Sequence, residues 1–150
     1  MLDSTTSLLD AIAIATAAVL FAIAGLHVYW LLGGCWPGRD AASLNAMVVG
    51  GQPGARMPPR VGTAAVSAAI TGSALGVLAA RGLIALPLPS VVRALTWVAA
   101  GALAVRGLGG FFDRRLRPHT RTLPFARLNV RIYSPLCLAL AAGTVAALVG

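Results

Sequence analysis

The sequence contains no lysine and no glutamate, and only four of its 150 residues are acidic. Charged residues make up 11% of the chain, whereas they make up about a quarter of a typical soluble domain. So few charges cannot cover the surface of a water-soluble globule. The shortage excludes a disordered tail, a coiled coil and a disulfide-stapled secreted domain, and it predicts an integral membrane protein.

The sequence also lacks the motifs of several enzyme classes. It has no CxxC pair, no HExxH, no GxSxG and no Walker-type glycine loop. Its two cysteines, Cys35 and Cys137, stand far apart in the chain, and only two histidines are available as further ligands. No metal site or catalytic group is therefore predicted, and no cofactor is assigned.

All 12 basic residues are arginines, and the net charge is +8. A nucleic-acid-binding surface needs a basic face on a soluble fold, with aromatic side chains interleaved. Here nine of the arginines lie in two segments between apolar stretches, the pattern that retains loops in the cytoplasm. We therefore expect that the protein has no nucleic-acid partner and that its partner is the lipid bilayer.

Four apolar stretches are long enough to cross a bilayer, whose core of ~30 Å needs ~20 helical residues. Residues 11–38, 61–80 and 132–150 contain no charge. We therefore expect one all-α domain of four transmembrane helices, with spans at about 8–32, 61–81, 91–112 and 132–150.

The arginines also predict the orientation of these spans. The segments 33–60 and 113–131 hold nine of them, against Arg81 and Arg93 on the other side. By the positive-inside bias both segments are cytoplasmic loops, and both termini lie outside the inner (plasma) membrane. A short ordered piece is expected around Leu44–Val49 in the first loop.

Small residues recur every four positions on the second span, where Gly72 and Gly76 form a GxxxG pair. Such pairs let two helices approach closely in lipid. One interpretation is a homodimer through Gly72 and Gly76. The other is packing between helices of the same chain, which the high alanine content favours.

Several polar side chains fall near the cytoplasmic ends of the spans, where one bundle can bring them together. We expect Arg106 inside the bundle, close to His27 and Tyr133 and bonded to Asp113 or Asn129. Each also has a plainer interpretation: a histidine bonded to a helix carbonyl, an interfacial aromatic belt, or an arginine that reaches the headgroups. The candidate ligand-binding residues are His27, Trp30, Arg106, Asn129 and Tyr133.

Parts of the sequence resemble a known family. The motifs are His27-Val28-Tyr29-Trp30 with a following Gly33-Gly34, Arg106 ahead of Phe111-Phe112, Phe125-Ala126-Arg127, and Tyr133-Ser134-Pro135-Leu136-Cys137. Together they are similar to small bacterial membrane proteins of domain-of-unknown-function family 3995. The resemblance covers nearly the whole chain and implies four spans, but no activity.

Three functions are compatible with these patterns. The first is a binding or transport module with a polar pocket for a lipid or small molecule at the cytoplasmic end of the bundle. The second is a membrane-embedded enzyme that uses His27 and Tyr133 to handle protons. The third is a structural or assembly subunit of a membrane complex. We favour the first because no complete acid–base pair with a nucleophile is present.

The arginine distribution makes a direct prediction about topology. Reporter fusions at Gly51 and at Thr120 should both give cytoplasmic signals, because both positions lie in arginine-rich segments. A periplasmic signal from either fusion would reverse the orientation.

Overall fold

The computed structural model describes residues 2–52, 55 and 57–150, and within these ranges it contains helices and no strand. Four helical stretches are long and apolar enough to cross a membrane, so the expected all-α, four-span fold is confirmed. The first three are α1 (Leu2–Leu31), α3 (Arg60–Ala80) and α4 (Pro89–Leu116). The fourth runs through α5 (Pro124–Leu128), a π-helical turn (Asn129–Tyr133) and α6 (Ser134–Val149).

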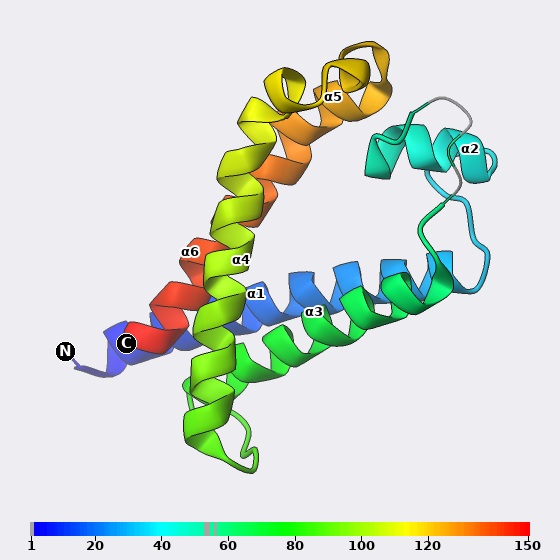
Figure 1. Ribbon diagram of the computed structural model, residues 1–150. Helices are drawn as coiled ribbons and strands as arrows, with labels where there is room; N and C mark the ends of the chain where they lie inside the picture. Colours follow the sequence, from blue (N-terminus) through cyan, green and yellow to red (C-terminus); the bar gives the residue numbers. More distant parts are fainter. Residues whose placement is uncertain (1, 53–54, 56) are drawn as a thin grey trace.

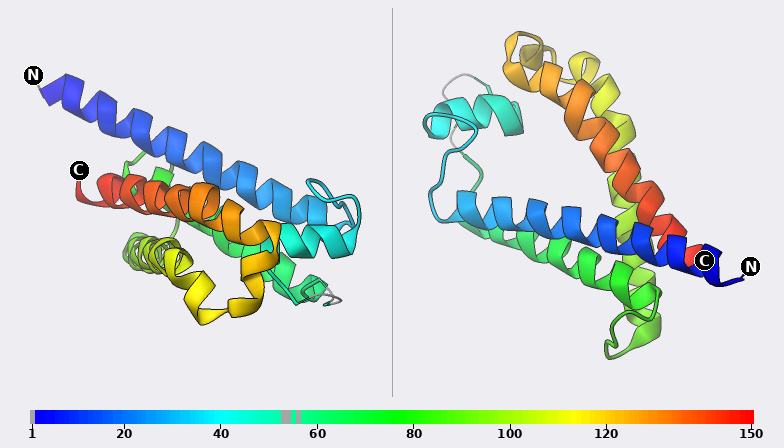
Figure 2. Two further views of the ribbon diagram at one scale, coloured as in Figure 1. Left: turned by 90° about the horizontal axis from the view of Figure 1, so that it is seen from above. Right: turned by 180° about the vertical axis from the view of Figure 1, so that it is seen from behind.

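The long helices form two pairs, α1 beside α3 and α4 beside α6. The pairs cross near the two chain ends and diverge from there, so that the molecule has the shape of a V (Figure 1). Figure 2 shows the same divergence from behind. We call each pair of helices an arm of the V. The crossing is the closed end, and the opposite side, where the arms are farthest apart, is the open end.

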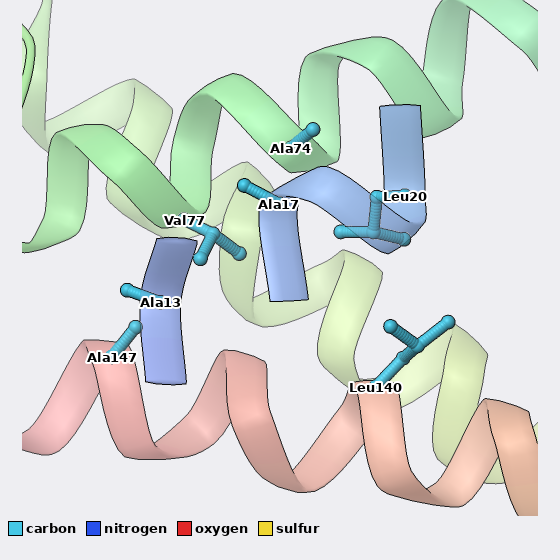
Figure 3. Close-up of a cluster of buried hydrophobic side chains, with 7 residues drawn as sticks. All are labelled: Ala13, Ala17, Leu20, Ala74, Val77, Leu140 and Ala147. Atoms are coloured by element: carbon cyan, nitrogen blue, oxygen red, sulfur yellow. The ribbon is translucent and has the colours of Figure 1, made fainter. Parts of the chain in front are cut away.

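A cluster of mostly small apolar side chains fills the closed end (Figure 3). Small side chains suit this place because apolar lipid gives little hydrophobic driving force, so that helices associate through close van der Waals contact. The cluster draws on α1, α3 and α6, and its buried members are Ala13, Ala17, Leu20, Ala74, Val77, Leu140 and Ala147.

Glycines bring the helices together at several contacts. A Cβ on Gly76 of α3 would overlap the Thr96 hydroxyl of α4, and a Cβ on Gly143 of α6 would overlap the Thr16 hydroxyl of α1. Between α4 and α6, a Cβ on Gly107 would stand 2.7 Å from Cγ of Leu138. Gly72, in contrast, has nothing within 4 Å of the same point. Of the GxxxG pair on α3, Gly76 therefore packs against another helix of the chain, whereas Gly72 does not.

Two arginines hold the helix ends together at the closed end. Arg81 forms an ion pair of 2.8 Å with Asp10 and so connects α3 to α1. Arg93 of α4 donates to the carbonyl of Leu148 in the last turn of α6. The last four carbonyls of a helix have no partner within it, and a cation there also interacts well with the helix dipole.

The segment between α1 and α3 contains the ordered piece that was expected around Leu44–Val49. It forms α2 (Ala41–Leu44) and a π-helical turn (Asn45–Val49). Asp40 caps α2 and accepts from the N–H and the hydroxyl of Ser43, each at 2.8 Å. These hydrogen bonds hold the pKa of Asp40 below its ordinary value of 3.8. Arg56, one of the arginines of this segment, lies outside the described residues.

The segment 113–131, predicted as a cytoplasmic loop between two spans, contains helical turns. α4 continues to Leu116, a 3-10 turn covers Pro118–Thr122, and the last helix already begins at Pro124. The span boundaries were predicted from apolar runs, and the third of these runs ends before α4 does. Asp113 and Arg117, four residues apart, form an ion pair that extends α4, and prolines at the first helical positions start the next two turns.

The contact at Gly76 can be tested by substitution. Gly76→Leu should destabilise the protein by about 1–3 kcal/mol, because the added side chain has no room against Thr96. Thermal unfolding in detergent measures the effect. Gly72→Leu is the matched control on the same helix, and its melting temperature should stay near that of the unmodified protein. Equal melting temperatures for all three would mean that Gly76 does not contact α4.

Candidate functional site: an apolar groove that ends at Arg106

A groove of about 690 Å³ lies between α3 and α4. Its lining is almost entirely apolar. The hydroxyls of Ser73 and Thr96 also line it, but each already donates to a carbonyl of its own helix, that of Ala69 and that of Val92, at 2.8 Å. Among the described lining residues Arg106 is the only charged one. The groove thus suits an apolar molecule that also carries a polar group.

Arg106 lies on α4 about 12 Å before Arg114, the first arginine of the basic segment, at 1.5 Å per residue. An arginine at the centre of a bilayer costs ~2.5 kcal/mol or more, so such a residue usually has a polar partner. Its Nη2 donates to Oδ1 of Asn129 at 2.9 Å. Arg106 and Asn129, two of the five candidate residues, are therefore in direct contact, as the sequence suggested, but Arg106 itself is exposed and not enclosed within the bundle as expected.

Asn129 is fully enclosed between α4 and α6. Only 1% of it is exposed, and its Nδ2 donates to the carbonyl of Gly110 at 3.0 Å. A Cβ on Gly110 would overlap the hydroxyl of Ser134 and stand 2.9 Å from Nη1 of Arg106. Because Gly110 has no side chain, the polar groups of Arg106 on α4 and of Asn129 and Ser134 on the last helical stretch can approach one another.

His27 and Trp30 contact each other, with ring centroids 5.0 Å apart in an edge-to-face arrangement. His27 Nδ1 lies 2.8 Å from the carbonyl of Ile23 one turn earlier, and Trp30 Nε1 donates to the carbonyl of Trp36 at 2.7 Å. Both residues belong to the last turns of α1, in the arm opposite to α4 and α6 (Figure 1). Within the described residues, no hydrogen bond joins them to Arg106.

Tyr133 contacts the segment between α1 and α3. Its hydroxyl donates to the carbonyl of Met47 at 3.2 Å, and its ring lies 6.2 Å from that of Phe125. Gly50, in the same segment as Met47, has a φ of +69°, and a Cβ there would stand 2.6 Å from the Phe125 ring. His119 Nε2 lies 3.1 Å from the carbonyl of Gly50. The chain from α1 to α3 thus crosses the open end and packs against the α4–α6 arm.

Asp113 does not bind Arg106, contrary to one of the two expected pairings. It pairs with Arg117, whose Nε donates to Oδ1 at 2.7 Å, and it accepts from the hydroxyl of Thr120 at 3.1 Å. Seven residues of helix place Asp113 on nearly the same face as Arg106, but about 10 Å farther along the axis. Arg117, only one turn away, is the closer partner.

Arg117 is a residue that sequence reasoning did not single out. Besides its ion pair, it donates to the carbonyl of Val49 at 3.3 Å, and its guanidinium lies 5.1 Å from the centre of the Phe125 ring. The spacing of four residues from Asp113 was a signal for the pair, whereas the contacts with Val49 and Phe125 depend on tertiary structure. Arg117 therefore connects the end of α4 to both neighbouring segments.

Cys35 and Cys137 are free thiols. Among the residues that the structure describes, no group of three histidine, cysteine or aspartate side chains is placed to hold a metal ion.

The fold and the groove define a small all-α membrane protein with four helices suited to span a bilayer. Residues 8–144 match the model of a family described as protein of unknown function (DUF3995), and the chain belongs to this family. The resemblance noted from the sequence is thus confirmed. No match was found among curated proteins or among solved structures.

The ion pair at the open end can be tested by Asp113→Asn. The change should cost about 1–2 kcal/mol, since it removes the charge that Arg117 and Thr120 share while Arg117 remains partly exposed to solvent. Hydrogen exchange should become faster in residues 113–123 and 45–50. Arg127→Gln, which removes an exposed charge nearby, should leave both segments protected. Unchanged exchange in Asp113→Asn would show that the pair does not hold these segments.

Proposed function

We propose that this protein is a small membrane-embedded binding module for an amphiphilic molecule, such as a lipid. The apolar part of the molecule lies in the groove between α3 and α4, and its polar end meets Arg106. One observation carries the proposal: an otherwise apolar groove ends at a single charged side chain. An amphiphile has this division of chemistry, because it joins an apolar chain to one polar group.

The enzyme hypothesis has less support. His27 and Tyr133 belong to opposite arms, and each has a hydrogen bond to a backbone carbonyl, of Ile23 and of Met47. Among the described residues, no contact pairs them as an acid and a base around one substrate. The polar pocket expected at the cytoplasmic end of the bundle becomes, in this proposal, a mainly apolar groove with a polar end.

An assembly role through a homodimer would have to use a different surface from the one expected. Gly76 contacts Thr96 of the same chain, so that of the expected pair only Gly72 is left for a partner. Gly72 lines the groove, and in the present proposal this surface receives the amphiphile.

For the location we propose the inner membrane of a bacterial cell, with both termini outside and the open end on the cytoplasmic side. The distribution of arginines supports this orientation. Arg81 and Arg93 belong to the closed end. The exposed arginines that follow α4 or form its last turn belong to the open end, and they are Arg114, Arg115, Arg121, Arg127 and Arg131.

A change that fills the groove without disturbing the fold tests the proposal. Gly72→Leu puts a large side chain into the groove at a position with nothing within 4 Å. Native mass spectrometry of the protein purified in mild detergent should show a bound lipid, and Gly72→Leu should lower the bound fraction severalfold.

Gly25→Leu on α1 is the matched control, because Gly25 is equally open but does not line the groove. It should retain the lipid as the unmodified protein does. Equal retention by Gly72→Leu and Gly25→Leu would contradict the groove as the binding site.

A further inference from the structure

Arg106 carries a charge that the described chain does not neutralise. Its described partner is the uncharged amide of Asn129, at 2.9 Å, and no described carboxylate lies within 4.0 Å of its guanidinium. Asp10 and Asp113 are engaged by Arg81 and by Arg117. Arg106 is exposed on the surface of the chain but belongs to a helix suited to span a membrane, where a cation is normally paired, so the site lacks an anion.

The hydroxyl of Ser134 is a second, independent sign of a missing partner. Ser134 is 0% exposed, and its Oγ has no hydrogen-bond partner, the one such buried side-chain atom among the described residues. It lies beside Arg106, since both Oγ and Nη1 approach the point where Gly110 would carry a Cβ. Buried polar groups nearly always have partners, and an acceptor next to Arg106 would serve both groups.

A hydrogen bond to Asn129 orients the guanidinium of Arg106. Asn129 accepts from Nη2 through its oxygen and is itself anchored to the carbonyl of Gly110 through its nitrogen. An arginine side chain has five N–H donors in a rigid fork, which matches the geometry of carboxylate and phosphate groups. The donors that Asn129 does not use remain for such a group at the end of the groove.

We propose that Arg106 binds an anionic headgroup, a carboxylate or a phosphate, whose apolar chain lies in the groove between α3 and α4, and that Ser134, which is enclosed and outside the lining of the groove, meets the same group when the Arg106 side chain turns aside. This inference rests on the proposed function and adds the chemical class of the ligand. The guanidinium supplies the charge and two parallel donors, and the Ser134 hydroxyl donates to an oxygen of the same group. A neutral amphiphile of the same shape lacks both interactions.

Two matched lipid pairs test the charge. Dioleoyl phosphatidic acid is compared with dioleoylglycerol, and oleate with methyl oleate, each added to the purified full-length protein and followed by native mass spectrometry. The anionic member of at least one pair should be retained roughly tenfold more than its neutral partner, the ratio that a charge-assisted hydrogen bond of this kind provides. The pair that shows the preference distinguishes a phospholipid from a fatty acid. Equal retention within both pairs would overturn the inference.

Three substitutions locate the preference. Arg106→Gln should bring the ratio close to one, and Ser134→Ala should reduce it severalfold. Asn129→Asp should also bring it close to one, because it offers Arg106 a carboxylate from the chain itself. Arg127→Gln, which removes an exposed arginine outside the groove, should keep the ratio of the unmodified protein and so controls for general attraction to anionic lipid.

Ser134→Ala is the variant least open to misfolding, because it removes a hydroxyl that has no partner in the chain. A lower ratio with an unchanged melting temperature supports a binding role for Ser134. An unchanged ratio in both Arg106→Gln and Asn129→Asp would overturn the site.

Gly72→Leu separates this inference from the proposed function. If the unmodified protein retains both members of a pair equally and Gly72→Leu loses both, the groove is supported as the binding site and the anion site is contradicted. If Gly72→Leu retains as much lipid as the unmodified protein and still prefers the anionic member, the anion site is supported and the groove is contradicted as the binding site.

Discussion

The structure depends on close contact between helices where they cross at the closed end. Lipid chains are as apolar as leucine, so helices in a bilayer gain little by burying apolar side chains and must gain by fitting closely. Here the fit comes from glycine against threonine, with Gly76 against Thr96 and Gly143 against Thr16. These contacts join α3 to α4 and α1 to α6, so that they fix one pair of helices against the other.

The divergence of the two pairs follows from having this contact at one end only. Toward the open end α3 and α4 separate (Figure 1), and the groove between them ends at Arg106. The open end is held by a different set of interactions, in which backbone carbonyls of residues 47–50 accept from Tyr133 and Arg117 and approach His119. Close helix packing, with two arginine contacts at the helix ends, thus holds one end of the V, and hydrogen bonds to backbone carbonyls of residues 47–50 hold the other.

With so few charged groups, each one that lies away from water has a recognisable use. Asp10 and Arg81 connect two helices, Arg93 caps the end of α6, and Asp113 fixes Arg117. Arg106 differs from these because its described partner is neutral. The same region holds Ser134, whose buried hydroxyl has no partner. The polar groups that the fold itself does not satisfy therefore lie together around Gly110, and of these Arg106 lines the groove.

The sequence by itself determined the class of protein, the four spans and the family, because long apolar runs and short motifs are local properties of the chain. It also pointed to Arg106 and Asn129 as polar residues at membrane depth, and these two are in contact. It did not predict the helical turns within 113–131, since arginine-rich helical turns give no apolar signal. Only the tertiary structure decided that His27 and Tyr133 lie in opposite arms, that Arg117 contacts Val49 and Phe125, and that Gly76 but not Gly72 packs within the chain. Those outcomes depend on the angle at which the two helix pairs cross, and that angle arises from contacts between residues far apart in the sequence.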